Sequence, residues 1–269
     1  MNKVFQKKHE LWLSISFASY AIKDEAIKSK LYDFSQIAFR HMKWLSSEIL
    51  KANGNYNYDR DMMLYKRENV FEILEALKDE VKNIQGIYPD NVLGGRIKTD
   101  DAYLLEYIST LLKDENNNKP ITAFNMQRKF LDKNLPQDQI DALTMFLFDE
   151  SYKEYELILV YAYMQARTKD ITQFDVFQDL IDESHFHLKS FANMMTELGI
   201  LALPRQLHEM TYIVDDLDQF IKDGIAEEEA AKEMCKELSD AIKDEELSKF
   251  FDFINFQENY HIKLMQKLL

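Results

Sequence analysis

Two side chains near the C-terminal end of the sequence have the types and spacing to bind a metal ion. Glu258 and His261 lie three residues apart in the segment 250–269, where apolar residues recur at helical spacing. Side chains three residues apart on a helix lie one above the other and can reach one point. A carboxylate and an imidazole on an apolar helix face are costly to bury without a partner. The partner is either a metal ion or, more simply, a hydrogen bond between the two side chains.

A histidine recurs at a fixed distance from three predicted helical turns. Each turn contains a Lys-Asp dipeptide, and a histidine follows each aspartate by seventeen residues. Apolar residues stand one, four and eight positions beyond each histidine. Repeated helical hairpins explain such a period. The aspartate and histidine pairs are Asp24 and His41, Asp170 and His187, and Asp244 and His261.

Two of these turns also have a glutamate sixteen residues before the aspartate. The two glutamates are Glu154 and Glu228. At about 1.5 Å rise per helical residue, the glutamate and the histidine of one hairpin lie at a similar distance from its turn, roughly 24 Å. Antiparallel packing therefore sets Glu154 level with His187, and Glu228 level with His261.

The composition predicts an all-α protein. The 269 residues include only 6 Gly and 4 Pro, with 46% apolar and 30% charged residues. A net charge of −14 argues against nucleic acid or an anionic membrane as a partner. The single Cys235 excludes a disulfide framework and a four-cysteine metal site. No apolar run has the length of a signal peptide core or a membrane span, so we expect a soluble, cytoplasmic protein.

Glycine, proline and polar clusters divide the chain into helical segments. We expect one domain at 1–135 and a second at 136–269, with a linker at 114–120 and a crossover of about 25 residues that begins at Gly199. Short helices are expected on both sides of Pro136. The predicted longer elements are hairpins at 4–52, 138–198 and 226–269, a helix at about 62–83, and a helix that Thr99 caps and that ends at 112.

The C-terminal pattern resembles a known family. Glu228-x-x-Ala231, a short turn and Glu258-x-x-His261 are similar to the second half of a ferritin-like or rubrerythrin-like carboxylate-bridged di-iron bundle; residues 150–198 are similar to its first half and 199–224 to its crossover. The resemblance implies a four-helix bundle with two iron ions. Four carboxylates balance two divalent ions, and imidazoles favour iron or manganese over calcium or magnesium. The implied ligands are Glu154, Glu183, His187, Glu228, Glu258 and His261.

One segment departs from the family pattern, because Ser184 stands three residues before His187 where the family has glutamate. Asp182 with His185 would restore the spacing, but that register turns polar residues of the helix inward. Glu183 with His187 keeps the apolar residues inward, and we favour this pair. Residues four apart still share a helix face, and a one-residue π-bulge near Ser184 would align them better. His185 would then be a solvated surface residue.

The N-terminal domain lacks the full pattern. Ala38 stands three residues before His41, and Glu10 lies fourteen residues before Asp24. A difference of two residues displaces a side chain by about 3 Å along a helix. We therefore expect 1–135 to be a second helical domain, a degenerate relative of the bundle. His41 is expected to be a packed or surface residue rather than a ligand.

The resemblance also implies a class of chemistry. Bundles of this kind react with dioxygen or peroxide in ferrous oxidation, peroxide reduction or substrate oxygenation. Tyr161, near Glu154, could hydrogen-bond a bound oxygen species or simply pack in the core. This sequence lacks the cysteine-rich electron-entry module of rubrerythrin, so turnover would need an external electron donor. The alternatives are a metal-sequestering protein without turnover and a helical interaction module with a remnant site. The sequence is also compatible with a homodimer.

Overall fold

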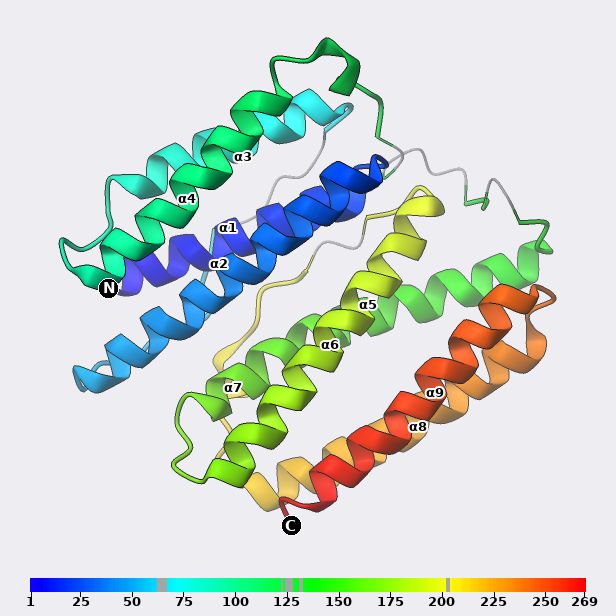
Figure 1. The fold of residues 1–269 in the computed structure, drawn as a ribbon. Coiled ribbons are helices and arrows are strands. Elements are labelled where there is room, and N and C mark those ends of the chain that lie inside the picture. Colours follow the sequence, from blue (N-terminus) through cyan, green and yellow to red (C-terminus); the bar gives the residue numbers. More distant parts are fainter. Residues whose placement is uncertain (62–66, 122, 124–127, 131–132, 202–203) are drawn as a thin grey trace. The chain divides into compact units, whose positions relative to one another are not determined.

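The computed structural model describes residues 1–61, 67–121, 123, 128–130, 133–201 and 204–269. As predicted, the protein is all-helical. It divides into two compact units, 1–126 and 127–269 (Figure 1), whereas the sequence placed the boundary between 135 and 136. No helix among the described residues is long and apolar enough to cross a membrane.

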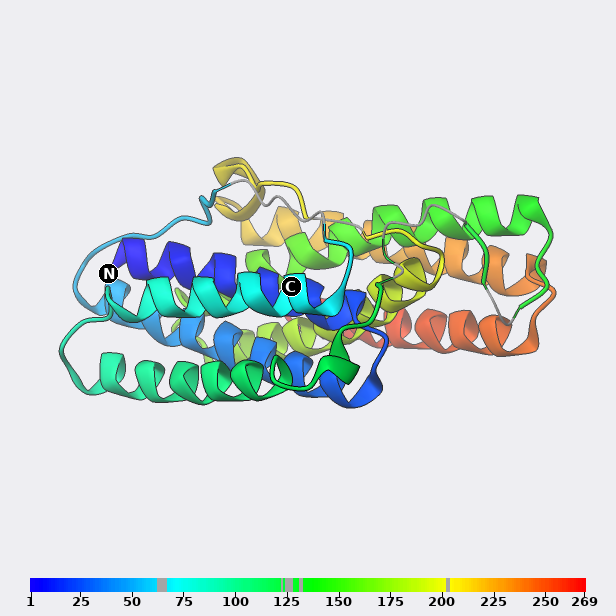
Figure 2. The same ribbon diagram turned by 90° about the horizontal axis from the view of Figure 1, so that it is seen from above.

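In the described part of the N-terminal unit, four long helices pack as two antiparallel pairs. The helix α1 pairs with α2 and α3 pairs with α4, while α1 also packs against α3 and α2 against α4 (Figures 1 and 2). The predicted linker belongs to this unit, because the Val70 N–H donates to the Lys119 carbonyl (2.9 Å) and the Ile121 N–H to the Glu68 carbonyl (3.1 Å). The elements are α1 (Asn2–Ala21), α2 (Glu25–Lys51), α3 (Val70–Gln85), α4 (Val92–Leu111) and the 3-10 turn η1 (Glu115–Asn117).

Two asparagine caps move the starts of α3 and α4 away from their predicted places. Asn69 caps α3, so the helix begins at residue 70 and not near 62; residues 62–66 lie outside the described part of the chain. Asn91 caps α4, and the predicted cap Thr99 lies inside that helix, where its hydroxyl donates to the carbonyl one turn back. Gly94 is required in the first turn of α4, because a Cβ there would lie 1.9 Å from the Pro89 carbonyl oxygen.

The C-terminal unit also contains two antiparallel helix pairs. The helix α5 pairs with α6 and α8 with α9, while α5 also packs against α8 and α6 against α9. The crossover is shorter than predicted, because α8 begins at residue 217 and not near 226. The described residues just before Pro136 are not helical, and the rest of the short helix expected there lies outside the described part. The elements are α5 (Gln137–Gln165), α6 (Ile171–Glu197), α7 (Glu209–Tyr212), α8 (Leu217–Ala241) and α9 (Glu245–Gln266).

The two units share one connectivity, a hairpin followed by a crossover and a second hairpin. The three repeated turns have the predicted role, since Asp24, Asp170 and Asp244 are the N-caps of α2, α6 and α9. The histidine seventeen residues after each cap therefore lies at the same depth in its helix. All three histidines are buried.

Apolar clusters on both sides fix the middle of the C-terminal unit. On one side, a cluster built by all four helices includes Leu147, Phe191, Cys235 and Phe251. On the other side, Tyr161 stacks on Phe177 with ring centroids 6.2 Å apart. Burying each large apolar side chain stabilises the fold by about 1.5–3 kcal/mol. These clusters hold the polar residues between them in place.

Candidate metal centre

The six predicted ligands lie at the middle of the C-terminal unit, and all four long helices contribute. They come from α5 (Glu154), α6 (Glu183 and His187), α8 (Glu228) and α9 (Glu258 and His261). All are buried except Glu183, whose side chain is 25% exposed. The structure thus brings the predicted residues together. Their role as ligands stays a prediction.

Glu154, His187 and Glu258 form one group that could hold an ion. One potential ligand atom from each lies within 4.8 Å of the others. The Nδ1 atom of His187 is 2.9 Å from Glu154 Oε1 and 3.6 Å from Glu258 Oε1. The Nε2 atom of His187 is 3.2 Å from Gln257 Oε1. An Nε2–H bond to Gln257 leaves Nδ1 facing the carboxylates, and such an outer contact orients a histidine ligand.

A second group shares Glu258 with the first. Glu228, Glu258 and His261 place potential ligand atoms within 4.8 Å of one another. The Nδ1 atom of His261 is 2.9 Å from Glu258 Oε2 and 4.0 Å from Glu228 Oε1, and its Nε2 atom contacts the Glu183 carboxylate. The rings of His187 and His261 are 5.5 Å apart between centroids. Glu258 therefore faces both histidines, one with each oxygen.

The helix α6 has the register that keeps its apolar residues inward. His187 is fully buried, whereas Asp182 is exposed and accepts a hydrogen bond from Gln178. The helix is regular throughout, so the π-bulge suggested near Ser184 is absent from it. Glu183 reaches His261 from an ordinary α-helical turn.

The expectation that His185 is a solvated surface residue is wrong. His185 is only 5% exposed. It stands four residues after Ile181 and three before Leu188, and both of these are buried. Residues at this spacing share a helix face, so His185 lies on a second buried side of α6. It belongs to neither group of potential ligands.

Protons offset the crowded carboxylates in the site. Burial raises the pKa of Glu228 well above its usual value, and the neighbouring Glu258 carboxylate adds to the rise. Burial alone would raise the pKa of Glu258, but hydrogen bonds with His261 and Glu228 lower it to about 2. Burial alone would lower the pKa of His261, but its contacts with Glu183 and Glu258 raise it to about 11. A neutral Glu228 and a charged His261 therefore lower the net negative charge of the cluster in the absence of a metal.

The sequence analysis missed two charged neighbours on α5. Glu150 is buried one turn before Glu154, and burial raises its pKa to about 7. Its position four residues from Glu154 was the available signal. Burial alone would lower the pKa of the half-buried Lys153, but the nearby carboxyl groups of Glu228, Glu150 and Glu154 raise it.

The site residues fit a transition metal ion. Glu154 Oε2 is buried without a hydrogen-bond partner among the described residues. No lysine or arginine is fully buried in the described part of the C-terminal unit, and the half-buried Lys153 is a cation next to the cluster. Carboxylate and imidazole donors are ligands that iron, manganese and zinc accept.

Two further residues border the cluster of carboxylates and histidines. Tyr161 is fully buried, and burial together with the charge of Glu228 raises its pKa well above the usual value. Cys235 is a buried free thiol, and burial raises its pKa too. Cys235 belongs to the apolar cluster, as a packed residue.

Comparisons with known proteins assign no family. The chain matches no family model, no curated protein and no solved structure.

Proposed function

We propose that the C-terminal unit binds two transition metal ions, iron or manganese, as ferritin-like and rubrerythrin-like bundles do. One observation carries the proposal. The carboxylate of Glu258 lies between two histidines, with Oε1 3.6 Å from His187 and Oε2 2.9 Å from His261. A carboxylate placed in this way can bridge two ions.

Each group would hold one ion. Glu154 and His187 would bind the first ion, Glu228 and His261 the second, and Glu258 would bridge them. Glu183, the most exposed of the six, lies on the side of His261 and would complete the second set. The four carboxylates offset the charge of two divalent ions, and the imidazoles favour iron or manganese over magnesium or calcium.

We further propose that the site reacts with dioxygen or peroxide, in ferrous oxidation, peroxide reduction or oxygenation. The ions would supply electrons and open coordination positions. The chain would supply the apolar clusters that limit water, and Glu150, whose pKa of about 7 suits proton transfer near neutral pH. Cys235 is the only cysteine in the sequence, so electrons for turnover would come from an external donor.

Anaerobic reconstitution with ferrous iron tests the binding. The full-length chain is expected to bind about two ions, and the Glu258→Ala, His261→Ala double variant to lose both, because Glu258 would bind both ions in the proposed site. Glu229→Ala is the matched control, since this exposed carboxylate adjoins Glu228 and is expected to leave the stoichiometry unchanged. Equal binding by the wild type and the double variant would exclude the site.

Oxygen or peroxide addition to the ferrous protein tests the chemistry. We expect consumption of the oxidant and near-ultraviolet absorption of oxo-bridged ferric iron. Iron that binds at two per chain but stays ferrous would exclude the redox proposal. That result would support a metal-sequestering protein instead.

A further inference from the structure

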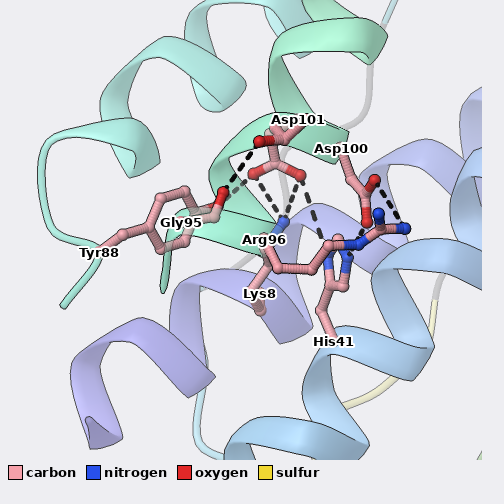
Figure 3. A network of polar contacts seen from close by, with 8 residues as sticks. Lys8, His41, Tyr88, Gly95, Arg96, Asp100 and Asp101 are labelled. Atoms are coloured by element: carbon pink, nitrogen blue, oxygen red, sulfur yellow. Dashed lines mark hydrogen bonds and ion pairs between the residues drawn. The ribbon is translucent and has the colours of Figure 1, made fainter. Parts of the chain in front are cut away.

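The N-terminal unit contains a buried ion pair that the proposed function does not use. Lys8 on α1 is 0% exposed, and its Nζ lies 2.6 and 2.7 Å from the two carboxylate oxygens of Asp101 on α4, which is 3% exposed (Figure 3). The hydroxyl of Tyr88 donates to the same carboxylate. Two kinds of donor thus converge on one buried anion.

His41 on α2 completes this network. Its Nε2 atom is 3.0 Å from Asp100 Oδ2, and its Nδ1 atom faces Asp101 Oδ1 at 4.0 Å. Arg96 pairs with the other oxygen of Asp100 at 3.2 Å. Burial and the charge of Lys8 lower the pKa of His41 to about 4, so the ring is neutral near pH 7. Two carboxylates therefore face two fixed cations, and the charges balance.

Lys8 stands at the position that a glutamate occupies in both hairpins of the C-terminal unit. It lies sixteen residues before the cap Asp24, as Glu154 lies before Asp170 and Glu228 before Asp244. Glu10, the nearest carboxylate, lies only fourteen residues before Asp24. The pairing of α1 with α2 and with α3 matches the pairing of α5 with α6 and with α8. Lys8 and His41 are therefore the counterparts of Glu154 and His187.

We infer that the N-terminal unit is a metal-free counterpart of the proposed di-metal site, in which the Lys8 ammonium takes the place of a metal ion. Replacing Lys8 with a carboxylate should then create a transition metal site with Asp101 and His41. The comparison rests on the proposed function of the other unit. The ligands of the new site, at positions 8, 41 and 101, are not among the six proposed ligands of the C-terminal unit.

Side-chain lengths support the replacement of the Lys8 ammonium by a glutamate and a bound ion. A glutamate side chain ends one atom before a lysine side chain, and a bound ion lies about 2.0–2.2 Å beyond a carboxylate oxygen. An ion bound by glutamate at position 8 would therefore lie near the present Nζ. That point is already within hydrogen-bond distance of both Asp101 oxygens, and the Nδ1 atom of His41 faces the same carboxylate.

Metal binding by full-length Lys8→Glu tests the inference. Anaerobic equilibrium dialysis against ferrous iron is expected to show about one more ion per chain than the wild type. Lys7→Glu is the matched control, because it makes the same charge change at the next residue, where the side chain is 34% exposed. We expect no gain for Lys7→Glu, and loss of the extra ion when His41→Ala is added to Lys8→Glu.

The outcomes separate this inference from the proposed function. If the wild type binds no metal but Lys8→Glu gains an ion, the di-metal site is refuted and the inference about Lys8 stands. A folded Lys8→Glu chain that binds no more metal than Lys7→Glu would overturn the inference about Lys8. If Lys8→Glu unfolds without metal, ferrous iron should raise its thermal midpoint. Lys8→Ala, which leaves room for a hydrated ion, is the second variant if Lys8→Glu does not fold even with iron, and a folded Lys8→Ala chain that gains no ion would then refute the inference.

Discussion

The two units of this protein neutralise buried carboxylates in different ways. In the N-terminal unit, the ammonium of Lys8 is a fixed cation that pairs with Asp101. In the C-terminal unit, the corresponding positions are glutamates, and protons on Glu228 and His261 lower the net negative charge. A proton can leave in exchange for a metal ion, whereas a lysine side chain cannot leave. The first arrangement is typical of a structural core and the second of a binding site.

The histidines show the same contrast. His41 and His261 both stand seventeen residues after a helix cap, and both are buried. Burial and Lys8 lower the pKa of His41 to about 4, whereas Glu183 and Glu258 outweigh burial and raise that of His261 to about 11. Position in the repeat therefore sets where the ring lies, and its neighbours set its charge.

Removing the fixed cation should have the largest effect on stability. Lys8→Met leaves Asp101 buried without its cation, and breaking such a pair costs about 3–5 kcal/mol. Lys7→Met, on the exposed side, should change the free energy of unfolding by less than about 1 kcal/mol. Chemical denaturation of the full-length variants measures both.

A double variant shows whether the pair itself is responsible. Lys8→Met with Asp101→Leu should recover most of the lost stability, because two apolar residues can replace a buried ion pair at little cost. If the double variant loses as much free energy of unfolding as the two single variants together, the two side chains contribute independently and the pair is not responsible.

Acid should destabilise the N-terminal unit through the neutral His41. The pKa of His41 is about 4 in the folded protein and about 6.5 in the unfolded chain. Between these values the unfolded chain binds a proton and the folded unit does not, so stability falls as the pH drops from about 6.5 to about 4. The loss is roughly 2–3 kcal/mol. His41→Gln should flatten this part of the pH profile, measured by denaturation between pH 4 and 7, and an unchanged slope would contradict the prediction.

Metal binding by the C-terminal unit should strengthen with pH. Two of its proposed ligands hold protons near neutrality, because burial raises the pKa of Glu228 well above its usual value and the contacts with Glu183 and Glu258 raise that of His261 to about 11; the pKa of His187 is raised as well. An ion must displace these protons, so affinity should rise about tenfold per pH unit for each proton released. Titration with Mn²⁺ at pH 6.5 and 7.5 measures the change, with proton release followed by a pH indicator. Equal affinities at the two values would indicate that the ligands bind without losing protons.

Much of this fold followed from the sequence because its signals were local. The three Lys-Asp turns and the long hairpins were predicted, since caps and helical periodicity depend on neighbouring residues. The starts of α3 and α4 were missed, because Asn69 and Asn91 compete with many other polar residues as caps. Burial of His185 was missed because α6 is buried on two sides, and a single apolar stripe was assumed.

The candidate site shows the same limit. Glu154, His187, Glu228 and His261 could be placed level with one another because depth along a helix follows from counting residues. Glu258 and Glu183 followed from their spacing to a histidine on the same helix. Counting residues does not reveal the role of Lys8, because that role depends on Asp101 from another helix pair. The Nζ atom of Lys8 lies 2.6 Å from Asp101 Oδ1. Glu150 was missed for a related reason, because only burial by the other helices distinguishes it from an ordinary surface glutamate.

The smallest expected effect concerns Glu183, the most exposed member of the proposed site. Its carboxylate contacts His261 while its side chain remains 25% exposed, so it should hold an ion less firmly than the buried ligands do. Glu183→Ala should weaken metal affinity about tenfold, within the range for loss of a supporting contact. Asp182→Ala should leave affinity unchanged, because Asp182 is exposed and bonded to Gln178. Competition with a coloured chelator can resolve this difference. A loss on Asp182→Ala with no loss on Glu183→Ala would mean that α6 presents its other register to the metal.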